Sequence, residues 1–341
     1  LEWEVLADGV RKLSGKVENL NVKPQERKAL QLGYKSDDLA QLEGELILTL
    51  RYILKSDYQL LKAGYEVGFN QITLRKGDIA KAYAAAATPA KGTQLTFEGR
   101  KVKGANFELE FCGMGYLTTY KLGGVSLLDE PLKPAFYRAM TENDYGVRKR
   151  NSNAIYYHSW KAFRNAETYM DLFLMSKEGN YIVVTAEYSY AELGMRVKMR
   201  YEIDGEGNVS VCMSMLPGKP KFDIKGMLRF GVDFAMPDNF NTIEFYGAGA
   251  TESYADRKSG TPIGIYKQSV ADQFCMTYSR PQESGAHCDL RYWTITDSTG
   301  TGFKFTSIKP FSATAIPYPM SQIDIHSHDY RKYPQLLETD G

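Results

Sequence analysis

Carboxylate side chains near arginine are the residues of this sequence that could take part in chemistry, for instance in acid–base hydrolysis of a glycosidic bond. That reaction needs two carboxyl groups flanking one bond, and the acid of the pair usually has a raised pKa. A carboxylate beside arginine is instead stabilised as an anion. We therefore predict no catalytic residue in this chain and expect its carboxylates to anchor loops. The candidates, each near Gly or Pro, are Glu142-Asn143-Asp144, Glu252, Asp256, Glu283 and Asp289.

Arginine side chains complete the predicted anchors, because a planar guanidinium group can bind a carboxylate through two hydrogen bonds. We expect Arg138 to pair with Asp144. Farther along the chain, Arg257 or Arg280 is expected to pair with Glu252 or Glu283. Partly buried pairs of this kind would hold the loops in place. The predicted loop-anchoring residues are Arg138, Glu252, Arg257, Arg280 and Glu283.

Two further patterns resemble cofactor or metal sites without completing one. Residues 246–252 (YGAGATE) begin like a dinucleotide-binding loop, but Glu252 stands where a third glycine belongs and no βαβ pattern surrounds it. We interpret this segment as a tight turn that needs the dihedral freedom of glycine. His326 and His328 would share one face of a strand, yet a zinc site needs a third protein ligand, and no other histidine lies nearby in sequence. The sequence thus predicts no metal site and no cofactor.

Composition excludes some partners. The 341 residues carry 42 Lys and Arg against 41 Asp and Glu, so the charge gives no sign of a nucleic-acid or anionic membrane partner. No apolar run approaches the roughly 20 residues of a membrane-spanning helix. The 24 Tyr and 16 Phe favour strands and suit carbohydrate surfaces. The four cysteines are widely spaced and are interpreted as reduced thiols; they are Cys112, Cys212, Cys275 and Cys288.

Strands and turns must position these residues, and the pattern predicts an all-β protein of two units. Residues 1–76 predict a small sandwich, and the alanine-rich stretch 77–93 is interpreted as a linker because it has no amphipathic stripe. Residues 94–341 predict one large two-sheet sandwich, with a single short helix near 154–163. The expected strands lie near 3–6, 17–22, 45–54, 67–74, 93–98, 107–111, 117–122, 180–190, 195–203 and 209–216.

Both ends of the sequence are expected to continue into a longer polypeptide. The first residues, Leu1-Glu2-Trp3, already have a strand-like pattern, and the last, Thr339-Asp340-Gly341, form no polar tail or helix cap. The large sandwich is therefore expected to be truncated at its end. The absence of a signal peptide carries no meaning for such a fragment.

Three segments resemble the C-terminal region of the large bacterial β-galactosidases of glycoside hydrolase family 2. Residues 136–146 (FYRAMTENDYG) resemble Trp/Phe-x-Arg-Ala-Pro-Thr-Asp-Asn-Asp-x-Gly, with Met140 in place of proline and Glu142 in place of aspartate. Residues 246–257 (YGAGATESYADR) resemble Tyr-Gly-x-Gly-Pro-x-Glu-x-Tyr-x-Asp-Arg, with Ala250 in place of proline.

The third segment, residues 278–293 (YSRPQESGAHCDLRYW), resembles the family's Arg-Pro-Gln-Glu-x-Gly segment, with His287 where arginine is usual. The order and spacing of all three segments agree with the family. Residues 3–74 are similar to the immunoglobulin-like domain that follows the family's barrel. The resemblance therefore covers nearly the whole chain, and it implies a galactose-mutarotase-like β-supersandwich for the second unit.

The resemblance also implies which parts of the enzyme lie elsewhere. The catalytic glutamates of these retaining enzymes, which hydrolyse terminal β-D-galactosides, belong to an upstream (β/α)8 barrel. The Mg and Na ions that family members often use belong to the same barrel. The upstream barrel would be the partner of this chain, and the isolated chain is expected to be inactive.

A loop of the last domain lies near the sugar in this family, so the resemblance implies that this chain contributes one wall of the active site. We expect the loop at 146–153 to be mobile, with a glycine hinge. The corresponding active-site-proximal residues are Asn143, Asp144, Gly146, Val147 and Arg148.

Two other functions stay open at this point. A freestanding carbohydrate-binding module is one of them, and a mutarotase-like epimerase is the weaker one, because fold does not imply function and no His and Glu pair is recognisable as acid and base. The natural galactoside and linkage, homo-oligomer formation and the bacterial compartment, cytoplasmic or periplasmic, are not determined by the sequence.

Overall fold

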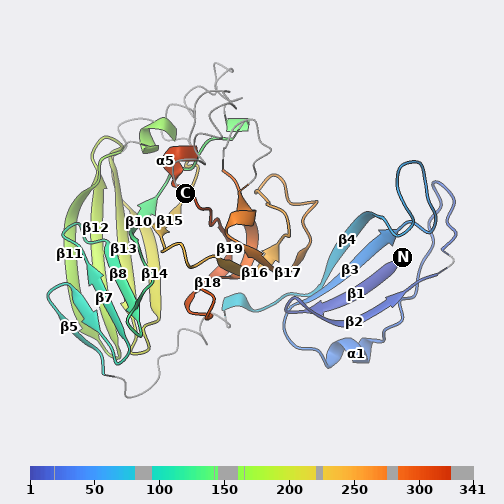
Figure 1. Cartoon of the computed structure of the whole chain (residues 1–341), viewed down its shortest axis with the longest axis horizontal. Coiled ribbons are helices and arrows are strands. Elements are labelled where there is room, and N and C mark those ends of the chain that lie inside the picture. The colour runs from blue at the N-terminus through green and yellow to red at the C-terminus, as the bar shows by residue number, and fades with distance from the viewer. Residues whose placement is uncertain are drawn as a thin grey trace.

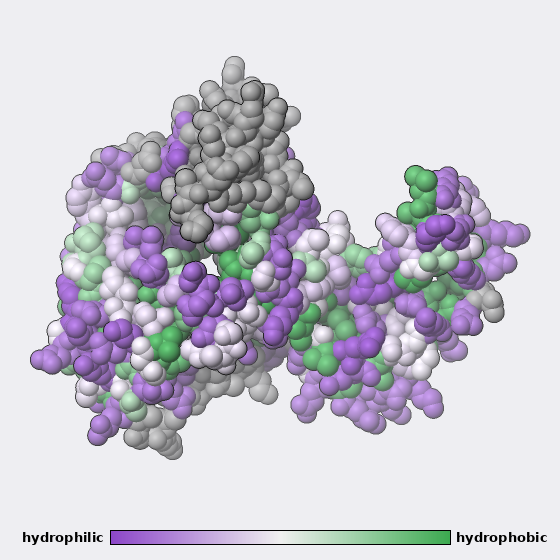
Figure 2. Space-filling model, in the orientation of Figure 1, coloured by the Kyte–Doolittle hydropathy of each residue, from purple (hydrophilic) through white to green (hydrophobic). Residues whose placement is uncertain are grey.

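The computed structural model describes residues 1–18, 20–80, 94–141, 143–144, 160–164, 166–219, 226–274 and 283–323. Within these residues nearly all regular structure is β-strand, in four sheets whose paired strands are antiparallel (Figure 1). The all-β fold class predicted from the sequence is confirmed. No helix of the described part is long and apolar enough to span a membrane. On the face shown in Figure 2, hydrophilic residues cover most of the surface and apolar residues form separate patches.

The first sheet is built from the N-terminal residues in the order β2-β1-β3-β4. Its strands are β1 (Glu2–Ala7), β2 (Val10–Lys16), β3 (Leu46–Ile53) and β4 (Glu66–Arg75). The β1–β2 hairpin turns at Asp8 and Gly9, whose φ angles of 46° and 79° are in the left-handed region that glycine tolerates best.

The strand predicted at 17–22 is wrong, because the described residues of this segment leave the sheet. The chain from 17 to 42, including the short helix α1 (Ser36–Ala40), instead covers the apolar face formed by Trp3, Val5 and Leu48. Burial of that face outweighs the weak strand preference of the segment. The covering side chains are Val17, Leu32, Tyr34, Leu39 and Leu42.

Two larger sheets enclose the main core, and they appear in Figure 1 on the side opposite the first sheet. One has the order β15-β10-β8-β7-β6-β5 with β9 paired to β8, and the other runs β11-β12-β13-β14. The first consists of β5 (Thr96–Glu98), β6 (Lys101–Lys103), β7 (Phe107–Phe111), β8 (Leu117–Leu122), β9 (Val125–Ser126), β10 (Glu130–Ala135) and β15 (Gly231–Ala235). The second consists of β11 (Tyr169–Glu178), β12 (Tyr181–Tyr190), β13 (Met195–Ile203) and β14 (Val209–Leu216).

Strict alternation explains why these two sheets pack on each other. Every second residue of β13 is buried, and the facing residues of β7 and β12 are buried in the same cluster. The predicted strands at 180–190, 195–203 and 209–216 are confirmed as consecutive antiparallel neighbours. Of the helix predicted near 154–163, residues 160–164 are helical, and 154–159 lie outside the described part, as do 81–93 of the predicted linker.

A fourth sheet lies between the main core and the first sheet in Figure 1, in the order β17-β16-β18-β19. Its strands are β16 (Thr242–Ala248), β17 (Ile263–Ser269), β18 (His287–Thr296) and β19 (Gly302–Ala313). The short helices η2 (Ala271–Gln273) and α5 (Met320–Ile323) follow β17 and β19. Phe245 stacks on Trp293 with ring centroids 5.2 Å apart, which places the core of this sheet on one face.

A buried ion pair joins the first sheet to the fourth. Arg291 of β18 donates from Nε and Nη2 to the two carboxylate oxygens of Glu45, at 2.9 and 2.7 Å, and the hydroxyl of Tyr246 donates to the same carboxylate. Beside this pair, the side chain of Gln71 exchanges hydrogen bonds of 2.9 and 2.6 Å with the backbone of Ile263. Burial opposes the charge of Arg291, but Glu45 raises the pKa of the guanidinium above its ordinary value. The two sheets are therefore held by groups that water reaches poorly.

Replacing Arg291 should separate the unfolding of the two sheets. Arg291→Met keeps the side-chain volume but leaves the Glu45 carboxylate buried without its cation, which costs on the order of 3–5 kcal/mol. We expect scanning calorimetry to show residues 1–75 unfolding at a lower temperature than the remainder, where the unchanged chain unfolds in one transition. Lys62→Met is the matched control, because Lys62 and its partner Asp57 are 83% and 57% exposed. A single transition at the original temperature in Arg291→Met would disprove the coupling.

Candidate functional site

Glu283 is the centre of a network that ties three loops together. Its carboxylate, buried just before β18, forms an ion pair of 2.9 Å with Nε of Arg138 through one oxygen and accepts a hydrogen bond from Arg229 on the other. The hydroxyl of Tyr254 donates to the main-chain carbonyl of Glu283. These partners come from the segments after β10, before β15 and after β16. Glu283 therefore ties three connections together, two through its carboxylate and one through its main-chain carbonyl.

The second anion of the network, Asp144, pins the turn that follows β10. Arg138 donates from Nη1 to Asp144 at 2.6 Å, and the same carboxylate oxygen accepts from the backbone and the hydroxyl of Thr141 at 2.8 and 3.0 Å. Burial opposes the charge of Arg138, but Asp144 and Glu283 raise its pKa above the ordinary value. The turn is thus fixed from its inner side, while Asn143 stays exposed on its outer side.

The third anion, Glu252, holds the loop after β16. One of its oxygens accepts from Nη2 of Arg257 at 2.6 Å and the other from the backbone of Gly285 at 3.0 Å. The guanidinium carbon of Arg257 lies 5.0 Å from the centre of the Tyr254 ring. Burial, together with the charges of Glu252 and Glu283, raises the pKa of Tyr254, so its hydroxyl remains a neutral donor. Across the surface, Asn143 donates to Asp256 at 3.5 Å.

The structure brings five of the predicted site residues into this one network: Arg138, Asp144, Glu252, Arg257 and Glu283. The partners of Glu283 are Arg138 and Arg229, whereas Arg257 binds Glu252. Asp289 lies outside the network and pairs with Lys258 at 2.9 Å. Five predicted residues fall outside the described part: Glu142, Gly146, Val147, Arg148 and Arg280. A role of any of these residues at an active site stays a prediction.

Sequence reasoning missed two members of the network. Tyr254 lies inside the motif at 246–257, so the signal was present and a buried hydroxyl beside two glutamates could have been inferred from it. Arg229 belongs to a segment without strand periodicity or motif, and nothing local marks it as the partner of a glutamate 54 residues away.

The interpretation of 246–252 as a tight turn that needs the dihedral freedom of glycine is wrong for residues 246–248, which belong to β16. Gly247 lies within β16 and neither it nor Gly249 has a positive φ. Their role is close packing: a Cβ atom on Gly247 would lie 2.6 Å from Leu290, and one on Gly249 would lie 2.7 Å from Tyr266. The glycines let β16 and its continuation approach the neighbouring strands.

The network engages its carboxylates in ion pairs. Its three carboxylates, Asp144, Glu252 and Glu283, each pair with an arginine, and those contacts hold the loops that carry them. In the part of the chain that the structure describes, no group of three or more His, Cys, Asp and Glu side chains could hold a metal ion. The arrangement is suited to orienting loops.

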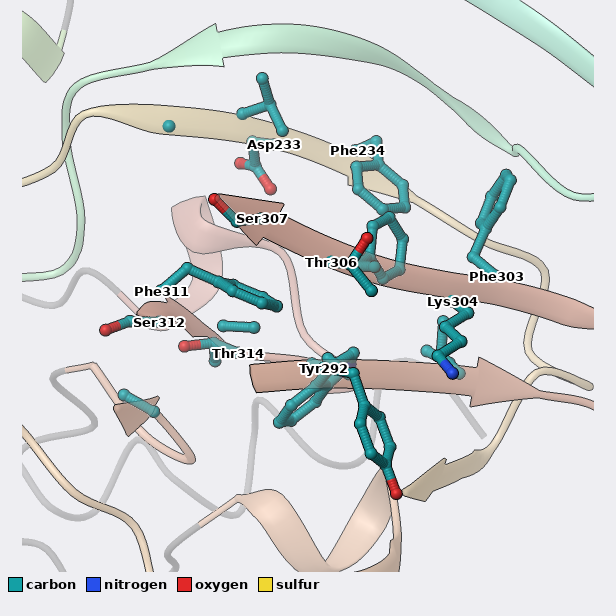
Figure 3. A pocket seen from close by; sticks show the side chains of 18 of the residues that line it. Asp233, Phe234, Tyr292, Phe303, Lys304, Thr306, Ser307, Phe311, Ser312 and Thr314 are labelled. Carbon is teal, nitrogen blue, oxygen red and sulfur yellow. The ribbon is translucent and has the colours of Figure 1, made fainter. Parts of the chain in front are cut away.

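A large cleft opens beside the network, with a volume of about 3720 Å³. Its walls combine aromatic rings, such as Phe303 and Phe311, with hydroxyls of Thr306, Ser307 and Ser312 (Figure 3). Small-molecule pockets occupy about 300–1,000 Å³, so this cleft is wide enough for an oligosaccharide or a polypeptide segment. Thr141, Asn143 and Asp144 border it.

Comparisons with known proteins agree on one family. The model described as "Beta galactosidase small chain" matches residues 103–339, and the model described as "Beta-galactosidase, domain 4" matches residues 1–75. A β-galactosidase of Priestia megaterium is 28% identical over 92% of this chain and 29% of its own length. One of Streptococcus thermophilus is 28% identical over 99% of the chain and 31% of its own length.

A β-galactosidase of Lactobacillus delbrueckii subsp. bulgaricus is 31% identical over 67% of this chain and 22% of its own length. The chain therefore spans about a third or less of the length of the curated relatives that it matches.

Arg138 should be the most sensitive arginine of the network. Arg138→Ala strands the buried Asp144 and Glu283 carboxylates, which costs on the order of 3–5 kcal/mol and should lower the melting temperature by several degrees. Arg196→Ala is the matched control, because Arg196 also contacts two carboxylates but is 43% exposed, and pairs of that kind contribute less than about 1 kcal/mol. Equal, small shifts in both variants, measured by circular dichroism melting, would refute the assignment.

Proposed function

This chain belongs to the β-galactosidases, since their small-chain family model matches residues 103–339, and we propose that it is the C-terminal accessory part of a longer β-galactosidase polypeptide. The observation that carries the proposal is the agreement of two family models, one matching residues 1–75 and the other residues 103–339, with a chain about a third the length of its relatives. In the complete polypeptide it would support a catalytic (β/α)8 barrel that hydrolyses terminal β-D-galactosides with retention.

The anchored loops supply the physical basis for a role at the active site. Asn143 is exposed on a turn whose inner side is fixed by Asp144, and Arg257 is 54% exposed although Glu252 holds it. Side chains fixed at the base and free at the tip are suited to meet a partner surface without much loss of entropy. We propose that this edge faces the barrel and forms one wall of the galactoside pocket.

The chemical step would belong to the barrel. The network carboxylates are committed to arginine, so this part would orient substrate and exclude water. We propose that the Mg and Na ions of the complete enzyme likewise belong to the barrel.

The isolated chain should not hydrolyse a chromogenic β-galactoside. Hydrolysis needs a carboxyl pair across one bond, and the network carboxylates are paired with arginines that hold loops. The measurement compares the purified 341-residue chain with the complete polypeptide encoded by its gene, at equal molar concentration. Release of product by the homogeneous chain, above the rate of buffer alone, would contradict the proposal.

Glycan binding is a second candidate function, and the cleft favours it. Aromatic rings beside hydroxyls, as at Phe303, Phe311 and Thr306, can stack on a sugar ring and bind its hydroxyl groups. Calorimetric titration of the isolated chain with β-galacto-oligosaccharides would distinguish the two: tight binding without a barrel favours a binding module. For an epimerase we find less support, since His287, the histidine of the described part, is almost fully buried.

Asn143 gives a direct test of the proposed wall in the complete enzyme. Asn143→Ala removes one exposed hydrogen bond to Asp256, so stability should change by less than about 0.5 kcal/mol. If the turn meets the substrate pocket, kcat/KM for a β-galactoside should fall several-fold. Asn70→Ala is the matched control, since it removes a similar exposed bond to Tyr52 on the first sheet. Identical kinetics in both variants would place the turn away from the pocket.

A further inference from the structure

His287 is buried where the fourth sheet meets the loop that carries Glu252. It begins β18, is 1% exposed, and its ring centroid lies 4.3 Å from that of Phe245. Nδ1 lies 3.2 Å from the carbonyl oxygen of Ala248, and Nε2 lies 2.7 Å from Oε1 of Gln273. Both ring nitrogens therefore face an oxygen.

These two contacts are the end of a longer chain of hydrogen bonds. The amide of Gln273 donates to Oε1 of Gln268 at 2.9 Å, and the amide of Gln268 donates to the carbonyl oxygen of Ala250 at 2.8 Å. The chain has four links, and each end is a backbone carbonyl. A carbonyl can only accept, so the orientation of every group between the two ends is constrained.

Counting protons shows what the four links require. A glutamine between two neighbours offers its NH2 group to one and its oxygen to the other, so Gln268 and Gln273 supply one proton each. A neutral imidazole supplies one more, and an imidazolium supplies two. Three protons cannot fill four links. Exchanging the oxygen and nitrogen positions of both side-chain amides does not supply the fourth bond, because the Gln268 oxygen would then face the carbonyl oxygen of Ala250 and neither can donate. All four hydrogen bonds can form only when His287 is an imidazolium.

The surroundings of the ring act in both directions on its charge. Burial lowers the pKa of His287 below its ordinary value, and the bond to Ala248 and the charge of Glu252 act in the opposite direction without cancelling that effect. Among described residues the other neighbours are uncharged: the rings of Phe245 and Trp293 from β16 and β18, and the amide of Gln273 from η2. On the same elements, Asp272 of η2 is bound to Ser269 and Cys288 to the backbone of Ser253.

When the ring is neutral, the link to Ala248 is the one that opens. It is the longer of the two, 3.2 against 2.7 Å. The carbonyl of Ala248 also has a second donor, the hydroxyl of Ser253 at 3.4 Å, so losing the histidine proton does not leave it without a partner. Gln273 has no such substitute on its oxygen in the described contacts.

We propose that His287 is a proton-controlled clamp, which ties the segment 248–252 to η2 as an imidazolium and releases Ala248 as a neutral ring. The released segment leads directly to Glu252, whose carboxylate holds Arg257 and the backbone of Gly285. The proton therefore acts on the position of the anchored loop. The proposal rests on this chain's own geometry and stands apart from the enzymatic role.

Nitrogen-15 spectra of the folded 341-residue chain, labelled in its four histidines, test the clamp. As the pH falls from 8 to 5, the His287 ring should change from carrying one proton on Nε2 to carrying one on each nitrogen. The backbone amide of Gly285 should exchange more slowly relative to its intrinsic rate at the acid end. A ring that keeps its proton on Nδ1 alone, or that never gains a second proton, would overturn the proposal.

Two variants separate the clamp from ordinary structural loss. His287→Gln fixes the number of protons at three, so the exchange of Gly285 should lose its additional pH dependence while the β-type circular dichroism spectrum is kept. Gln273→Glu places a carboxylate at Nε2 and should shift the titration of His287 to higher pH, because a nearby anion favours the imidazolium. If His287→Gln does not fold, the direction of the Gln273→Glu shift still decides. No shift, or a shift to lower pH, rejects the clamp.

Discussion

The arrangement of this molecule depends on an ion pair that water hardly reaches. Glu45 and Arg291 come from the two ends of the described chain and meet through two hydrogen bonds between the first and fourth sheets. Removing both charges from water costs several kcal/mol per ion, and that cost is offset only when the geometry is good and the remaining hydrogen-bonding positions of both groups are occupied. Here Tyr246 donates one further hydrogen bond to the Glu45 carboxylate. Asp8 fixes the start of β3 by accepting from the backbone of Glu45 at 2.7 Å.

The same solution recurs at the loop site, a short distance along the same strands. Tyr246 lies in β16 and Arg291 lies in β18. The chain continues from the end of β16 to Glu252, and Glu283 lies shortly before the start of β18. The pair that joins the sheets and the network that anchors the loops therefore share two adjacent strands. A rigid sheet that carries anchored loops on its edge can fix exposed side chains to within small tolerances. The proposed contact with a catalytic barrel needs that kind of support.

Local signals made the strands predictable and left the junctions unpredictable. Alternating burial on β12 and β13 follows directly from the sequence pattern, because side chains of a strand alternate between faces. The network at Arg138 and Asp144 was within reach because six residues separate the pair. Glu45 and Arg291 are 246 residues apart, and no periodicity or motif links them. Likewise, side chains from the segment between β2 and β3 pack on Trp3. The exposed apolar face that they cover exists only once the sheet has formed, so the sequence pattern did not indicate this packing.

Met140 stands where the family pattern has proline, and the structure shows what holds the segment around it. Proline restricts one backbone angle of a turn, and methionine does not. In this chain Met140 is 1% exposed, so its side chain adds core burial, while the hydrogen bonds of Asp144 to Arg138 and Thr141 hold the backbone that follows. Hydrogen bonds to a buried anion thus replace a covalent restraint. A restraint of this electrostatic kind depends on charge. The shape of the loop therefore depends on Arg138, which also pairs with Glu283.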